Sequence, residues 1–277
     1  MDAMPIDMSQ ELMAWSSQLR TSQKYLSAVT DQLLALPQGG TAVGTGINAP
    51  PRFSREFAKE VSKIEKIKAR PSENFFHSLS SQDTSLRLSG EMRNLATVLM
   101  KISNDLRWMN SGPLSGLGEI ELQALQPGSS IMPGKVNPVI PEAVTMVCAE
   151  VIGNDTTVAI AAQSGNFQLN VMLPVIAYNL LKSLNILSNA MSVLGHKAIK
   201  TFKVNKTTIQ ESLEKNPVLV TALSPVIGYA KAAEIAKKAY KERRSLIEVA
   251  LEETKLSRKR LEKLLNPENL TSGGVKK

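Results

Sequence analysis

Residues 128–138 bring together side chains that could bind and deprotonate a small molecule. The stretch holds two glycines, two prolines, two serines, one lysine and one asparagine. Glycine and proline at these spacings predict an irregular loop, and Pro138 suits the first turn of a helix that starts here. Because a helix N-terminus offers unpaired backbone N–H groups and the positive end of its dipole, such a loop favours an anionic ligand. The alternative interpretation is a plain linker between helices, and the density of polar groups argues against it.

Ser129 and Ser130 are the candidate reactive groups of this loop. A serine hydroxyl is a poor base unless neighbouring donors stabilise its alkoxide. The donors nearby in sequence are the backbone N–H groups of the loop and the ammonium of Lys135, and the amide of Asn137 adds another. Each pKa unit is worth about 1.4 kcal/mol, so several donors have to converge on one oxygen. A Ser–His–Asp hydrolase is a poor interpretation, because the Gly-x-Ser-x-Gly elbow is absent.

Glu142 follows Lys135 by seven residues and falls in the first turn of the helix that the loop opens. A carboxylate in this position is commonly a favourable partner of the helix dipole. If its side chain faces the site, it could instead form a proton relay with an imidazole. The sequence leaves both interpretations open.

The sequence contains no motif that indicates metal binding, nucleotide binding or redox chemistry. The single cysteine, Cys148, and the two histidines, His77 and His196, show no metal-ligand spacing. Neither the Gly-x-Gly-x-x-Gly nor the P-loop pattern occurs. We therefore expect no metal and no cofactor, a buried structural thiol at Cys148, histidines that are structural or exposed, and a reducing, cytoplasmic location.

Nucleic acid and membrane are also poor partners for this chain. The net charge is +8 and basic residues are dense toward the end, but no aromatic interleaving or groove-reading motif accompanies them. A solvated helix surface is the better interpretation. The most apolar run, 139–163, is interrupted by charged and amide side chains, which argues against a membrane span.

The loop is set among long predicted helices. Apolar residues recur at helical spacing over 8–36, 84–109, 138–164 and 171–194, and only 4% of residues are aromatic, which favours helices over sheets. The third helix is apolar nearly all round, as in the centre of a bundle or an oligomer. Its polar residues need partners if they are buried, and neighbouring chains could supply them.

Shorter elements follow Gly195, with a higher density of charge. We predict an all-α protein in which a long-helix bundle, 1–198, carries the loop 128–138. A small helical C-terminal domain, 199–277, follows, with a disordered tail from about residue 271. Residues 71–84 are expected to be irregular.

The loop wording Gly-Ser-Ser-Ile-Met-Pro-Gly-Lys-Val-Asn-Pro resembles the signature loop of the fumarase/aspartase superfamily. The resemblance to its metal-independent class II fumarases extends over essentially the whole chain. It includes the stretches 39–46, 101–108, 164–170 and 218–223.

The resemblance implies roles for five residues. Ser129 would remove a proton from C3 of malate, and Ser130, Lys135 and Asn137 would bind the dicarboxylate substrate. Glu142 would pair with a histidine of another subunit near the attacking water. The resemblance further implies a homotetramer whose long helices form a shared bundle, with each site built from three chains.

One departure from the family pattern bears on activity. Family members carry a Thr-His pair just before the stretch that corresponds to residues 1–5, and an N-terminal domain precedes it. We therefore expect a fumarate hydratase-like lyase subunit with impaired activity. Two alternatives remain. The first is an aspartate ammonia-lyase, because residues 138–142 and 152–157 also resemble the sequences of that enzyme. The second is an inactive helical assembly fragment.

Overall fold

The structure, a computed structural model, describes residues 3–274 and is built almost entirely from helices, as predicted. Four of them are long: α1 (Met8–Leu33), α4 (Asp83–Met109), α5 (Val139–Ala162) and α6 (Leu173–Leu194). The bounds of these four helices agree closely with the ranges that the apolar periodicity predicts. Two two-residue ladders occur among the described residues: β1 (Ala35–Leu36) pairs in parallel with β2 (Arg70–Pro71), and β3 (Ile120–Glu121) pairs antiparallel with β4 (Lys203–Val204).

The described residues divide into two compact units. The bundle unit contains 16–108 and 122–202, and the C-terminal unit contains 3–15, 109–121 and 203–274. The division into domains after residue 198 stays a prediction. The predicted disordered tail falls partly on 275–277, which lie outside the described residues.

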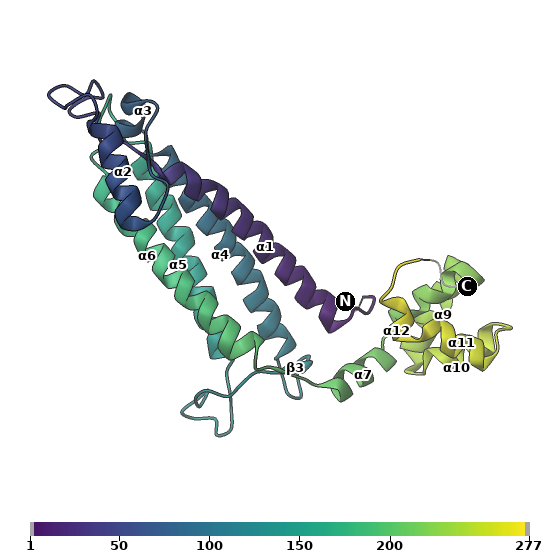
Figure 1. The fold of residues 1–277 in the computed structure, drawn as a ribbon. Coiled ribbons are helices and arrows are strands. Elements are labelled where there is room, and N and C mark those ends of the chain that lie inside the picture. Colours follow the sequence, from purple (N-terminus) through teal and green to yellow (C-terminus); the bar gives the residue numbers. More distant parts are fainter. Residues whose placement is uncertain (1–2, 275–277) are drawn as a thin grey trace. The chain divides into compact units, whose positions relative to one another are not determined.

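Figure 1 shows the long helices of the bundle unit running alongside one another. Polar contacts join these helices in sequence order. Arg87 of α4 donates to Gln32 of α1 at 2.7 Å, and Arg93 of α4 donates to Asp155 of α5 at 2.7 Å. Between α5 and α6, Asn154 donates to the hydroxyl of Ser183 at 3.0 Å. The buried polar residues of α5 therefore find partners within the chain, although Oδ1 of Asp155 accepts no hydrogen bond among the described residues.

The apolar core of this bundle follows the helical repeat. On α4, every third or fourth side chain is buried, and these residues are Met92, Leu95, Leu99, Ile102 and Leu106. Helix α5 is long and apolar enough to cross a membrane, with a mean hydropathy of 1.3 over its most apolar window. It packs on α6 and buries Asn154, and 33% of this window is buried among the described residues. Cys148 is fully buried as predicted, and burial raises the pKa of its thiol to about 11.

Shorter elements connect or follow the long helices in the chain. Helix α2 (Phe53–Glu65) and helix α3 (Phe75–Ser80) lie between α1 and α4 in sequence, and the π-helix η1 (Gly195–Ile199) follows α6. The prediction of an irregular stretch over 71–84 was wrong, because Asn74 caps α3 by accepting from the N–H of His77 at 3.1 Å. Six residues are too few to show a helical period in the sequence.

The C-terminal unit has its own core. Its helices are α7 (Lys206–Glu214), the 3₁₀ helix η2 (Pro217–Leu223), α8 (Ser224–Ile227), α9 (Tyr229–Glu242), α10 (Leu246–Glu253), α11 (Arg258–Leu265) and α12 (Pro267–Leu270). Buried side chains of η2, α9, α10 and α11 form one cluster, centred on Leu223, Ile235, Val249 and Leu261. Serine caps start two of these helices: Ser245 accepts from the N–H of Ile247 on α10, and Ser257 accepts from the N–H of Arg260 on α11.

Candidate functional site

The loop 128–138 closes on itself immediately before α5. The N–H of Gly128 donates to the carbonyl of Lys135 at 2.7 Å, and the side-chain amide of Asn137 donates to the carbonyl of Gly128 at 3.1 Å. The N–H of Lys135 in turn donates to the carbonyl of Met132 at 3.2 Å. The predicted irregular loop is confirmed, and Pro138 is the N-cap residue that directly precedes α5.

Gly128 is the residue that permits this closure. A Cβ atom at this position would lie 2.8 Å from the carbonyl oxygen of Lys135 and 2.9 Å from both the N and the Oδ1 of Asn137. Contacts this short with backbone atoms force the surrounding structure to shift. A glycine is therefore required where the two ends of the loop meet.

Ser129 is half-buried, and its hydroxyl oxygen accepts two backbone hydrogen bonds. The N–H of Ile131 lies 3.2 Å from this oxygen and the N–H of Met132 lies 3.1 Å from it. Such donors favour negative charge on the oxygen that accepts them. The same geometry also occurs as a local turn that serines adopt in loops, so it allows a base but does not require one.

Ser130 and Lys135 are exposed on the same loop. The Lys135 ammonium has no ion pair among residues 3–274 and adds a positive charge to a segment that already presents backbone donors. Asn137 uses one N–H of its amide to hold the loop closed. An amide carries two N–H donors, so the second remains for a ligand. The structure thus brings four of the five predicted residues onto one closed loop.

Glu142, the fifth predicted residue, lies in the first turn of α5 and is half-buried. Among the described residues its carboxylate has neither an ion pair nor a hydrogen bond. No imidazole of this chain serves it, because His77 pairs with Asp83 at 3.0 Å and His196 contacts the carbonyl of Ser192 at 2.8 Å. Both interpretations of Glu142 stay open within one chain, and a relay would need an imidazole from elsewhere.

No group of three or more potential metal ligands occurs among residues 3–274. The sequence did not predict a pocket that the structure shows in the C-terminal unit. No residue of the loop 128–138 lines this pocket. Its lining comes from separate helices, so no motif marks it in the sequence.

Two family models match the chain. The model described as "Lyase" matches residues 1–153, and the model described as "Fumarase C C-terminus" matches residues 219–272. The first of these covers more than half of the chain.

Curated relatives carry consistent names. The chain is 60% identical over 275 residues to "Fumarate hydratase class II 2" of Pseudomonas aeruginosa, covering 99% of this chain and 60% of the relative. It is 56% identical to "Fumarate hydratase class II" of Xylella fastidiosa, covering 99% of this chain and 58% of the relative. The chain thus spans about 60% of the length of the curated relatives it matches.

Solved structures agree with the observed fold. Class II fumarase from Schistosoma mansoni superposes with a TM-score of 0.94 at 35% identity, covering 98% of this chain and 60% of that structure. A fumarate lyase:delta crystallin from Brucella melitensis superposes with a TM-score of 0.93 at 43% identity, covering 98% of this chain and 59% of that structure.

Proposed function

The chain belongs to the lyase family, and from this membership we propose that it forms part of a metal-independent fumarate hydratase, which interconverts fumarate and L-malate. The observation that carries the proposal is the closed loop 128–138, in which two backbone N–H groups converge on the Ser129 oxygen. Relatives that match almost the whole chain are named class II fumarate hydratase, which supports this substrate class.

In the proposed dehydration of malate, the Ser129 oxygen takes the proton from C3. The electron pair of the broken C–H bond moves into the adjacent carboxylate, which becomes a doubly negative aci-carboxylate. Lys135, Asn137 and Ser130 hold the substrate through its carboxylate oxygens, and the α5 N-terminus adds a favourable dipole. The electron pair then returns from the aci-carboxylate to form the C2–C3 double bond as the C2–O bond breaks, and the leaving hydroxyl takes a proton from the imidazole that pairs with Glu142 and departs as water. Glu142, paired with a histidine of another chain, acts at this water.

The assembly that we propose is a homotetramer in the cytoplasm, with neither nucleic acid nor a membrane as a partner. Exposed apolar side chains along α5 and α6 support self-association, among them Met146, Ile160, Leu181 and Leu184. The Glu142 carboxylate, which has no partner among the described residues, fits a site completed by other chains.

The test compares malate-to-fumarate turnover by this chain with turnover by a fusion. The fusion places the remaining N-terminal portion of the Pseudomonas aeruginosa relative before Met1. We expect the fusion to be active and the chain alone to be inactive or severely weakened, because groups that act as a unit are lost together.

Within the fusion, Ser129→Ala should lower turnover about 100-fold or more, as expected for loss of a general base. Ser130→Ala, the matched control, should chiefly raise KM. Full turnover by Ser129→Ala would contradict the proposed role. Deamination of aspartate without malate turnover would favour the ammonia-lyase, and inactive chains that still assemble would favour a helical assembly fragment.

A further inference from the structure

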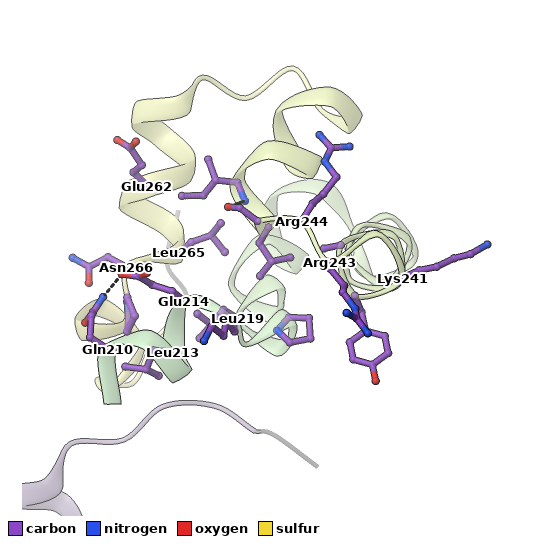
Figure 2. A pocket seen from close by; sticks show the side chains of 18 residues that line it. Gln210, Leu213, Glu214, Leu219, Lys241, Arg243, Arg244, Glu262, Leu265 and Asn266 are labelled. Carbon is purple, nitrogen blue, oxygen red and sulfur yellow. Dashed lines mark hydrogen bonds between the residues drawn. The ribbon is translucent and has the colours of Figure 1, made fainter. Parts of the chain in front are cut away.

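The C-terminal unit contains a pocket with a volume of about 1150 Å³. It lies between α7, the start of η2, the end of α9 with the turn into α10, and the end of α11 (Figure 2). This volume is at or slightly above the range of about 300–1,000 Å³ that small-molecule sites occupy. The pocket can therefore hold an organic molecule rather than a few waters.

One wall of the pocket is apolar and is formed by core residues of the unit. Leu219, Leu246 and Leu265 line it, and all three are buried members of the core cluster of this unit. Leu213 of α7 and Ile247 of α10 extend the apolar surface. Such a wall favours a ligand with an apolar body, because contact removes apolar surface of both partners from water.

The charged side chains of the lining are unequal in sign. Four are cationic and two are acidic: Lys215, Lys241, Arg243 and Arg244 against Glu214 and Glu262. Arg244 is already neutralised, since its guanidinium donates to Glu242 at 3.1 Å and to Glu252. Glu214 accepts from Gln210 at 3.0 Å. The pocket therefore has an excess of positive charge that its own acids do not balance.

Arg243 is an exposed cation of the pocket lining, at the turn from α9 into α10. Figure 2 shows Arg243 and Arg244 where α9 ends, whereas Lys241 extends away from the pocket. Arg243 has no ion pair among residues 3–274. Its backbone is left-handed, with a φ of 54°, where it caps the C-terminus of α9. Glycine avoids the strain of such a position, and Lys66 at the end of α2 has the same geometry.

We propose that this pocket is a second binding site, for a small organic anion with an apolar body. The carboxylate or sulfonate group of such a ligand pairs with the Arg243 guanidinium, and its apolar body packs on Leu219, Leu246 and Leu265. The site goes beyond the proposed hydratase function, because no residue of the loop 128–138 takes part in it.

The experiment titrates the full chain with 8-anilinonaphthalene-1-sulfonate, an aromatic sulfonate whose fluorescence rises in apolar surroundings. The test variant is Arg243→Gly, which removes the cation and relieves the left-handed strain, so it should fold at least as well as the original chain. Lys66→Gly is the matched control, because Lys66 also caps a helix, α2, with a φ of 55°, but does not line the pocket.

We expect the dye to bind at a saturable site. Its affinity should fall about tenfold in Arg243→Gly, which is the typical loss of one charge-assisted hydrogen bond. Its affinity for Lys66→Gly should equal that for the original chain. Bound dye should also slow hydrogen exchange in 210–219 and 239–247. Equal affinity in the two variants, or no protection in these segments, would overturn the proposal. So would dye binding that disappears as protein concentration rises, because a second copy of the chain would then be the occupant. None of these readouts uses catalytic activity, so they are independent of the hydratase proposal.

Discussion

At the scale of single residues, the loop 128–138 depends on where it lacks a side chain. Its two ends meet at Gly128, which touches the backbone of Lys135 and Asn137 closely enough to exclude a Cβ. The closed loop then directs two N–H groups at Ser129. The chemistry proposed for Ser129 therefore rests on a glycine to which the proposal assigns no role in substrate binding.

Gly128→Ala should open the loop without unfolding the bundle. The added Cβ would press on the two groups that close the loop, and overpacking of this kind costs about 1–3 kcal/mol. Cleavage by trypsin after Lys135 should become about tenfold faster or more, since proteolysis follows the population of the open form. Gly153→Ala is the control, because a Cβ there meets nothing within 4 Å. Equal cleavage rates in the two variants would contradict this account of the loop.

At the scale of elements, an ion-pair network joins α9 to α10 in the C-terminal unit. Lys231 and Lys238 of α9 each donate to the Glu253 carboxylate at 2.7 Å, and Arg244 donates to Glu252 at 3.1 Å. Exposed pairs contribute little singly, but a network that shares partners is more persistent. Hydrogen bonds from Lys231 and Lys238 hold the pKa of Glu253 at about 2, against an ordinary 4.5.

This network should make the C-terminal helices sensitive to acid. A carboxylate whose pKa is lowered in the folded state stabilises that state above its unfolded pKa, and the effect is lost as pH falls toward the folded pKa. Between pH 4.5 and about 2, the free energy of unfolding of the original chain should therefore fall more steeply than that of Glu253→Gln. Urea unfolding followed by circular dichroism measures this difference.

The control for the acid experiment is Glu211→Gln, which removes an exposed carboxylate from α7. It should follow the pH dependence of the original chain. If Glu253→Gln and Glu211→Gln behave alike throughout the acid window, the network does not contribute to stability there.

At the scale of the whole molecule, the long helices leave large apolar side chains exposed. On α6, Leu181 is 65% exposed and Leu184 is 55% exposed, although both lie on a helix that packs against α5. Contiguous exposed apolar surface commonly marks a protein–protein interface. The proposed homotetramer gives this surface a partner.

We therefore expect Leu181→Glu with Leu184→Glu to weaken self-association while leaving the fold of each chain intact. Placing carboxylates in a desolvated interface is strongly unfavourable, and the dissociation constant should rise about tenfold or more. Sedimentation velocity over a range of protein concentrations measures it. The control Ile64→Glu changes a side chain on α2 that is 71% exposed. A monodisperse monomer for the original chain at every concentration would refute the association itself.

The helical class, the four long helices and the irregular loop could be predicted from residue types and spacing, because apolar periodicity and the backbone limits of glycine and proline are local properties. The sequence also indicated that His77, His196 and Cys148 are structural or exposed rather than reactive. Only the tertiary structure showed that Arg93 pairs with Asp155, that Asn137 closes the loop, and that a pocket forms beside Arg243. These features depend on dihedral angles and on contacts between segments far apart in the chain. Residue spacing does not encode such distances, so they emerge only when the helices pack.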